Sequence, residues 1–265
     1  MSDASFVGNI PEHYDRGLGP IFFADFAQEM AQRAAAHAPR RVLETSAGTG
    51  IVSRLRDLLL RETLLTVTDL NPPMLEVARS KFAPGEAVQF EPADATALPF
   101  PDGSFDLLVC QFGVMFFPDK QTSYREAYRV LQPGGHYLFS VWDAHRFNPL
   151  PRLVHEMLGR FFSDDPPRFY EVPFAYHRID PIKEAVTAAS FTGFAAAVLH
   201  IDKAVPDIAA FARGVIYGNP VVDQIRARGG DPERVVERVS EIVRREFGDP
   251  PKIPLHTIFF EATRP

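Results

Sequence analysis

A run of small residues after an apolar pair is the stretch of this sequence best suited to hold a ligand. Val42-Leu43 leads through Glu44 into Thr45-Ser46-Ala47-Gly48-Thr49-Gly50, and apolar residues then recur at helical spacing. Small side chains let a ligand approach the backbone, and the N–H groups that open a following helix point at it. We expect Glu44 to project its carboxylate into the same crevice. The pattern is typical of a nucleotide-type cofactor site at the carboxyl edge of an α/β sheet.

Polar side chains also stand at the ends of three further predicted strands. Asp69 ends the second strand, Asp94 follows the third, and Gln111 ends the fourth. Parallel strands joined by right-handed crossovers bring their carboxyl ends to one edge of a sheet. We therefore expect these three side chains to converge with the glycine turn on a single site.

The positions of the strands follow from apolar runs that alternate with helical patterns. This alternation predicts an α/β fold, Rossmann-like and doubly wound, with a mostly parallel seven-stranded sheet, an antiparallel last strand and an added helical segment. The expected strands are residues 41–46, 64–69, 87–91, 105–111, 136–142, 195–202 and 255–263. The expected helices are residues 21–37, 51–60, 73–82, 119–131, 181–193 and, with a break at 218–220, 205–247.

These patterns divide the chain into three parts. Residues 1–37 are expected to form an N-terminal helical segment, and residues 38–145 the cofactor-binding half of the Rossmann-like domain. Residues 146–265 complete the sheet and carry the added helical segment, at about 205–250, which we expect to lie over the sheet edge and cover the substrate. A group of aromatic residues either lines a substrate pocket or packs this part against the sheet: Phe161, Phe162, Phe169, Tyr170, Phe174 and Tyr176.

Charge and composition argue against several classes of protein. The net charge is −6, the isoelectric point is about 5.8, and no basic stripe is present, so we expect no nucleic-acid partner. The single cysteine, Cys110, excludes an internal disulfide, and its apolar neighbours indicate a buried side chain. No apolar run approaches the ~18 residues of a membrane span, and no signal-peptide pattern opens the chain. We expect a cytoplasmic monomer or homodimer without membrane insertion.

Taken together in this order and spacing, the four strand ends resemble those of a known family. The chain is similar to class I S-adenosylmethionine-dependent methyltransferases, and most similar to the small-molecule group of the ubiquinone/menaquinone-biosynthesis type. The resemblance covers about residues 40–145, including the run Arg129–Gly135. The family motif runs acid-x-Gly-x-Gly-x-Gly, and this chain has Ser46 in place of the first glycine. Because serine carries a β-carbon, the φ angle of the turn at Ser46 must be one that suits a side chain.

The resemblance implies a role for each of the matching positions. Asp69 would take the ribose hydroxyls of the cofactor, and Asp94, with Ala95, would accept from the adenine amino group. Gln111 and Phe112 would meet the methionine portion. The remaining implied cofactor-binding residues are Glu44, Ser46, Ala47, Gly48 and Gly50 in the turn, Leu70 and Met74 near adenine and ribose, and Tyr14 in an N-terminal segment that folds over the cofactor.

The catalytic residue is not identified by the sequence. A sulfonium methyl is already activated, so the protein mainly aligns the reactants and excludes water. The acceptor is expected to be a small molecule methylated on oxygen, nitrogen or carbon, with S-adenosylhomocysteine as the second product. His145 is a weak candidate for a general base. The histidines show no metal-ligand spacing, so we expect no metal site.

Two other functions stay open at this point. A non-catalytic member of the family would bind the cofactor without turnover. A nicotinamide-dependent oxidoreductase would share the strand-turn-helix layout, but its fingerprint needs a third glycine where this chain has Ser53.

Overall fold

The computed structural model describes residues 5–265, apart from the side chains of residues 54 and 55. Within these residues, seven strands form one sheet in the order β3-β2-β1-β4-β5-β7-β6. Neighbouring strands from β3 to β5 are parallel, and β7 is antiparallel to both β5 and β6. The predicted fold class is therefore confirmed. The strands are β1 Arg41–Glu44, β2 Leu64–Asp69, β3 Val88–Pro92, β4 Phe105–Gln111, β5 Leu131–Trp142, β6 Thr192–Ala204 and β7 Lys252–Thr263.

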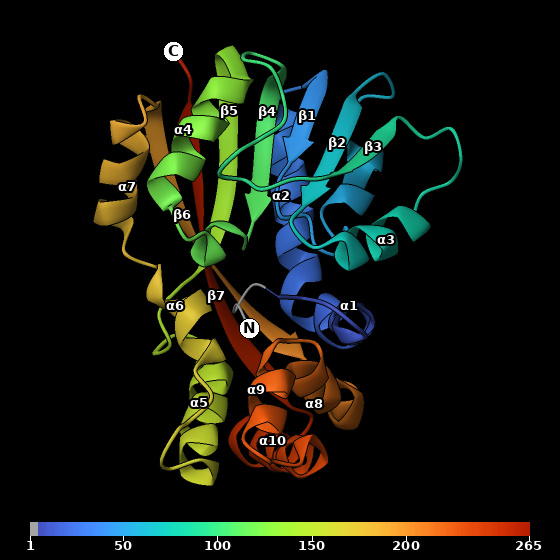
Figure 1. Cartoon of the computed structure of the whole chain (residues 1–265), viewed down its shortest axis with the longest axis vertical. Helices are drawn as coiled ribbons and strands as arrows, with labels where there is room; N and C mark the ends of the chain where they lie inside the picture. Colours follow the sequence, from blue (N-terminus) through green and yellow to red (C-terminus); the bar gives the residue numbers. More distant parts are fainter. Residues whose placement is uncertain (1–4) are drawn as a thin grey trace.

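Helices cover both faces of the sheet and one of its ends. Figure 1 shows α4 in front of the sheet, α2 behind it, and α5, α8, α9 and α10 gathered beyond its lower edge. The α-helices are α1 Ile10–His13, α2 Ala24–Ala36, α3 Pro72–Ser80, α4 Lys120–Val130, α5 Pro149–Phe161, α6 Val172–Ala175, α7 Ile179–Ala188, α8 Ile208–Tyr217, α9 Val221–Ala227 and α10 Pro232–Glu246. A π-helix spans Tyr14–Phe23, and 3₁₀-helices span Ser53–Leu58, Val114–Phe116 and Phe169–Glu171.

Local sequence signals explain where several of these helices begin. Asp119, Asp207 and Asp231 are the N-caps of α4, α8 and α10, and each carboxylate accepts a hydrogen bond from a backbone N–H of the first turn. Prolines at the first positions of α3 lack an N–H that would be unpaired there in any case. The central strand β4 is buried along almost its whole length, as expected for a parallel strand covered on both faces.

One expected helix was wrong, and two helical segments were not among the expected helices. Residues 51–60 do not form an α-helix: the chain forms a short 3₁₀-helix over Ser53–Leu58, and the Arg56 guanidinium donates to the carbonyls of Leu60 and Arg61 just after it. Residues 10–20 belong to the expected N-terminal helical segment but precede its expected helix at 21–37, and they are also helical. The helix α5 at 149–161 was not among the expected helices.

The helix expected at 181–193 is α7, which ends earlier, at Ala188. Ser190 adopts a φ of +76°, a left-handed conformation that stops a helix and lets β6 begin at Thr192. The expected helices of 205–247 are confirmed as α8, α9 and α10, and the break at 218–220 is also correct.

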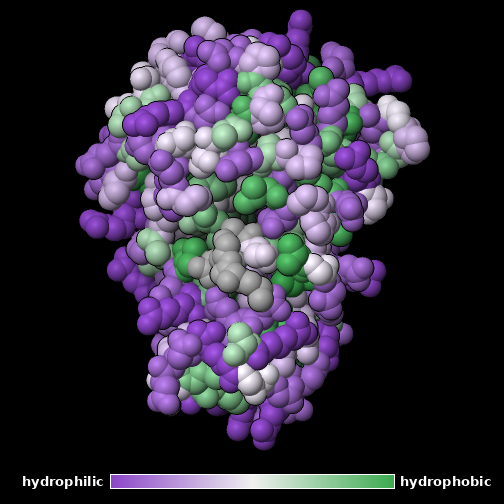
Figure 2. Space-filling model, in the orientation of Figure 1, coloured by the Kyte–Doolittle hydropathy of each residue, from purple (hydrophilic) through white to green (hydrophobic). Residues whose placement is uncertain are grey.

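The long strands β6 and β7 connect the sheet to the added helices. In Figure 1, β7 runs from the group of α8, α9 and α10 up through the sheet towards the C-terminus. Figure 2 shows hydrophobic side chains gathered between the sheet and the added helices, on a face that is otherwise mostly hydrophilic. No helix within residues 5–265 is both long and apolar enough to cross a membrane. The first four residues of the expected N-terminal segment lie outside the described part of the chain.

Candidate active site

A cavity of about 250 Å³ lies at the carboxyl ends of the parallel strands. Most of the residues that the sequence singled out meet in its wall, which is consistent with the expected convergence of the strand ends. The predicted residues that line it are Tyr14, Ser46, Gly48, Asp69, Leu70, Met74, Asp94, Ala95, Gln111 and Phe112. Phe6, Asn71, Ala93, Gly113, Phe116, Phe117 and Pro118 complete the wall and were not predicted.

Asp69 ties the turn after β1 to the end of β2. Its Oδ2 accepts a hydrogen bond of 2.8 Å from the backbone N–H of Gly48, and its Oδ1 accepts one of 2.8 Å from the N–H of Asn71. The side chain is only 6% exposed. Burial raises the pKa of Asp69, and the backbone N–H donors oppose this shift.

The turn itself has the close backbone approach that its small residues predicted. Ser46, Gly48 and Gly50 have φ values of +53°, +57° and +74°, so Ser46 adopts the left-handed conformation that favours glycine although it carries a β-carbon. Gly50 cannot be replaced without movement, because a Cβ there would lie 2.8 Å from the Cβ of Ala78 on α3. The Ala47 N–H donates to the carbonyl of Thr68, which fixes the turn against β2.

Glu44 is placed differently from our expectation. Its carboxylate does not project into the cavity but accepts a hydrogen bond of 2.5 Å from Ser53 Oγ, and the residue is 2% exposed. Burial raises its pKa to about 8, and the hydrogen bond from Ser53 works against that rise. Ala47 and Gly50 also lie outside the lining, so these three residues shape the turn from behind.

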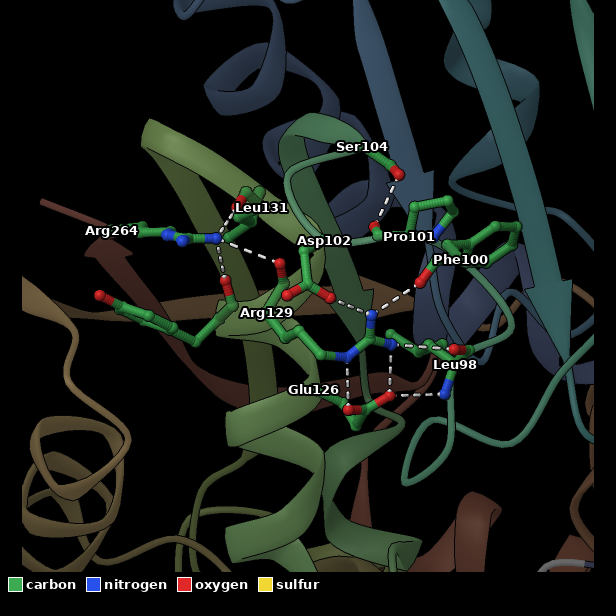
Figure 3. A network of polar contacts seen from close by, with 10 residues as sticks. Leu98, Phe100, Pro101, Asp102, Ser104, Glu126, Arg129, Leu131 and Arg264 are labelled. Atoms are coloured by element: carbon green, nitrogen blue, oxygen red, sulfur yellow. Dashed lines mark hydrogen bonds and ion pairs between the residues drawn. The ribbon is translucent and has the colours of Figure 1, made fainter.

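The loop that carries Asp94 is held in place by an arginine of α4. The Arg129 guanidinium donates to the carbonyls of Leu98 and Phe100 at 2.9 and 2.7 Å, and it pairs with the carboxylate of Glu126 (Figure 3). Glu126 in turn accepts from the N–H of Leu98 at 2.8 Å. Asp94 itself accepts from the N–H of Thr96, also at 2.8 Å. This network fixes the third strand end at the cavity.

The end of β4 offers the cavity an unpaired polar atom. Gln111 Oε1 is buried and has no hydrogen-bond partner among the residues that the structure describes. A buried acceptor without a partner is costly, so this atom is suited to a polar hydrogen of a ligand. Phe112, the next residue, has a φ of +57° and stacks on Trp142 with ring centroids 4.2 Å apart.

The N-terminal segment closes the cavity from the opposite side. Asp15, on the π-helix, accepts a hydrogen bond of 2.7 Å from Thr49 Oγ1 and forms an ion pair with Lys81 at the end of α3. The N–H of Phe6 donates to Asn71 Oδ1 at 3.2 Å. Tyr14 lines the cavity, and burial together with the nearby Asp69 carboxylate raises the pKa of its hydroxyl.

A second, smaller cavity of about 70 Å³ lies directly behind the first. Four residues line both cavities: Phe6, Tyr14, Phe112 and Phe116. Of the aromatic group between 161 and 176, three members line the smaller cavity, namely Phe169, Tyr170 and Phe174. The remaining lining residues are Leu18, Phe22, Phe23, Met115, Trp142, Asn148, Pro151, Pro173, Asn219 and Leu255.

His145 lines neither cavity. Its ring lies against that of Phe174 at a centroid distance of 4.6 Å, with 36° between the ring planes, and burial lowers its pKa. A role as general base is not supported by this position. Cys110 is completely buried on β4, in agreement with its expected role as a small apolar side chain.

Comparison with known proteins agrees with this geometry. Residues 43–139 match the family described as a methyltransferase domain. The chain is 45% identical over 103 residues to a demethylmenaquinone methyltransferase of Thermus thermophilus, covering 37% of this chain and 45% of that protein. It is 32% identical over 174 residues to a ubiquinone/menaquinone biosynthesis C-methyltransferase of Psychromonas ingrahamii, covering 58% and 67% respectively. The chain spans about half the length of the first curated relatives that it matches.

Solved structures show the same fold at low sequence identity. A phosphoethanolamine N-methyltransferase of Haemonchus contortus, in complex with S-adenosylmethionine, has a TM-score of 0.64 and 16% identity, covering 99% of this chain and 59% of that one. The YcgJ protein of Bacillus subtilis has a TM-score of 0.58 and 21% identity, covering 89% and 98%. The chain belongs to the class I S-adenosylmethionine-dependent methyltransferases, the family whose members use S-adenosylmethionine as cofactor.

Proposed function

We propose that this chain transfers the methyl group of S-adenosylmethionine to a small apolar acceptor held in the smaller cavity. The observation that carries the proposal is the wall of Phe6, Tyr14, Phe112 and Phe116, which borders both cavities. A cofactor in the larger cavity and an acceptor in the smaller one would meet at this wall. Direct transfer between two bound molecules requires this kind of adjacency.

The lining of the larger cavity supports a role for each strand end in holding the cofactor. Asp69 would accept from the ribose hydroxyls while it still holds the Gly48 turn. Asp94, with Ala95, would accept from the adenine amino group, and Leu70 and Met74 would pack near the base and ribose. Gln111 has a free buried oxygen to accept a polar hydrogen from the methionine portion.

Methyl transfer from a sulfonium is an in-line displacement. The acceptor atom forms a bond to the methyl carbon as the sulfur–carbon bond breaks, and the sulfonium becomes the neutral thioether of S-adenosylhomocysteine. The cofactor supplies the activated methyl group. The chain contributes alignment and exclusion of water, for which an aromatic wall between the two ligands is well suited.

The smaller cavity favours an uncharged acceptor. Among the described residues that line it, none is an acid, lysine, arginine or histidine. Asn148 is buried and already satisfied, because it donates to the carbonyl of Asp143 and accepts from the N–H of His256. Asn219 donates to the carbonyl of Val215. Charged acceptors would lose their hydration here without compensation.

The names of the relatives support a narrower chemical class of methyl acceptor. Several of them are C-methyltransferases of ubiquinone and menaquinone biosynthesis. An electron-rich aromatic ring of the quinol type matches the chemistry of a cavity walled by Phe22, Trp142 and Phe174, because aromatic rings pack favourably against one another, but it needs more room than the present volume of about 70 Å³. The ring carbon would gain the methyl group, and its proton would pass to water when the product leaves the cavity.

Two measurements test the proposal in sequence. Calorimetric titration with S-adenosylhomocysteine is expected to give a dissociation constant at or below tens of micromolar. Transfer of a radiolabelled methyl group to a panel of reduced, hydroxylated ring compounds is then expected to give a methylated product. Absence of binding would overturn the cofactor proposal. Binding without transfer to any member of the panel would favour a non-catalytic role.

A matched pair of variants tests whether the two cavities bind different ligands. Phe174→Ala is expected to raise the KM for the acceptor about tenfold or more while the affinity for S-adenosylhomocysteine stays unchanged. Phe161→Ala is the control, because Phe161 is 44% exposed and lines neither cavity. Equal effects of the two substitutions on KM would contradict the assignment of the acceptor cavity.

A further inference from the structure

We propose a second ligand site, for a divalent transition-metal ion of the Zn²⁺ type, formed by His37, His136 and Glu261. His37 follows the last residue of α2, His136 lies on β5, and Glu261 lies on β7. One ligand atom from each of the three side chains lies within 4.8 Å of the other two. The three residues are far apart in the chain, so no local spacing of histidines could reveal the group.

The sheet places two of these residues on one face. In the antiparallel pair, His136 is opposite Thr263 and Leu138 is opposite Glu261, so His136 and Glu261 are diagonal neighbours with side chains on the same side. His136 is four residues before Ser140, which pairs with Gln111 at the cofactor cavity. The proposed site is therefore about 13 Å along the strand from that edge, at ~3.3 Å per residue.

The distances between the ligand atoms suit a small tetrahedral ion. His37 Nε2 is 3.2 Å from Glu261 Oε1, and His136 Nδ1 is 3.3 Å from the same oxygen. Bonds of about 2.0–2.1 Å to a tetrahedral Zn²⁺ would hold neighbouring ligand atoms about 3.3 Å apart. The two imidazole rings are stacked at 3.9 Å with 30° between their planes, so they must splay slightly to aim both lone pairs at one ion.

The chemistry of the donors selects the class of ion. Two imidazole nitrogens and one carboxylate suit Zn²⁺ and its neighbours in the first transition row, whereas Mg²⁺ and Ca²⁺ prefer oxygen ligands. The side chains of His37, His136 and Glu261 are 22%, 28% and 30% exposed, so an ion can reach them from solvent. Three protein ligands leave a fourth position for water. A bound ion would tie the end of α2 to β5 and β7.

Titration of the metal-stripped, untagged chain with ZnCl₂ in a calorimeter tests the site. One equivalent of Zn²⁺ is expected to bind with a dissociation constant of about 10 µM or lower. His37→Gln, His136→Gln and Glu261→Gln are each expected to weaken binding at least tenfold. No saturable binding by the natural chain up to 100 µM ZnCl₂, or unchanged affinity in all three variants, would overturn the proposal.

The chain offers a matched control in a second histidine pair. His200 stacks on His256 at 4.3 Å and lies 3.2 Å from an oxygen of Asp202. His200→Gln is expected to leave Zn²⁺ affinity unchanged, and loss of binding in this variant would instead place the ion at His200. Zn²⁺ is also expected to raise the melting temperature of the natural chain and not that of Glu261→Gln. This readout requires neither methyl transfer nor cofactor.

Discussion

The carboxylate of Asp69 accepts a 2.8 Å hydrogen bond from the backbone N–H of Gly48, so one side chain at the end of β2 fixes the turn that follows β1. The same carboxylate faces the larger cavity, where it is available to a ligand. It is buried, and each of its oxygens already has a backbone N–H partner. The shape of the turn and the affinity for the cofactor should therefore depend together on this residue.

Asp69→Asn is expected to weaken binding of S-adenosylhomocysteine by about 10- to 100-fold. The amide keeps the size of the side chain but loses the charge, and charge-assisted hydrogen bonds contribute about 1.5–3 kcal/mol. Calorimetric titration measures the loss. Asp180→Asn, on the exposed side of α7, is the control and should bind as the natural chain does. Retention of full affinity by Asp69→Asn would show that the cofactor does not contact this carboxylate.

Glu44→Gln is expected to stabilise the fold increasingly as the pH rises. The pKa of Glu44 is about 8 in the folded chain and near 4.5 when unfolded, so the fold penalises the ionised form. This penalty is absent below about pH 4.5, grows by ~1.4 kcal/mol per pH unit, and levels off above pH 8. Glutamine cannot ionise. The difference in free energy of unfolding between Glu44→Gln and the natural chain should therefore widen from pH 5 to pH 8.

Urea unfolding at several pH values in this range measures the difference directly. The comparison of two chains cancels the titration of groups that both share. A constant difference between the two proteins from pH 5 to pH 8 would contradict the assignment of a raised pKa to Glu44.

Arg129→Ala is expected to lower the free energy of unfolding by about 2–3 kcal/mol. It removes hydrogen bonds to two backbone carbonyls and leaves Glu126 without its ion pair. Because the Asp94 loop depends on this network, cofactor affinity should fall as well. Arg125→Ala, on the exposed side of the same helix, should change stability by less than about 0.5 kcal/mol.

Arg129→Lys tests whether the planar geometry of the guanidinium or only its charge stabilises the loop. Lysine keeps the charge but cannot reproduce the planar donors that reach Leu98, Phe100 and Glu126 at once. We expect it to recover less than half of the stability that Arg129→Ala loses. Full recovery would mean that charge alone holds the loop. Urea unfolding gives the comparison for all three variants.

Asp15→Asn is expected to speed dissociation of the cofactor several-fold with little change in global stability. The substitution weakens the contacts of the N-terminal segment with Thr49 and Lys81. Stopped-flow measurement of S-adenosylhomocysteine release tests it. Asp25→Asn is the matched control, because Asp25 pairs with Lys203 on β6, and neither residue lines the cofactor cavity. Equal release rates for Asp15→Asn and the natural chain would mean that this segment does not retain the cofactor.

The residues at the carboxyl edge of the sheet could be predicted from the sequence because strand ends are determined by local sequence patterns. Mostly apolar runs such as residues 105–111, alternating with helical patterns, indicate buried parallel strands, whose last residues lie at the common edge of the sheet. Asp69, Asp94 and Gln111 therefore met as expected. Glu44 was misplaced because a side chain near a strand end can turn either way. Here Ser53, nine residues later, supplies the partner that turns it inward.

Long-range packing explains what the sequence could not predict. A Cβ at Gly17 would lie 2.6 Å from Gly214 Cα on α8, so Gly17 allows a close helix contact that no local pattern predicts. In α5, the residues Leu150, Val154 and Leu158 repeat at helical spacing, and this signal was present but hidden by the prolines. Residues from many separate segments line the smaller cavity, so no spacing of residues in the sequence predicts it.

Phe6 and Tyr14 line both cavities, so a movement of this wall would affect both of them. The smaller cavity, at about 70 Å³, is tighter than the ~150 Å³ void known to accept benzene in another protein, so a ring compound requires this wall to move first. Both side chains belong to the N-terminal segment that Asp15 holds down. A single displacement of the N-terminal segment would therefore open both cavities. Loading of the acceptor and exchange of the spent cofactor would then share a single gate, whose frequency sets an upper limit on turnover.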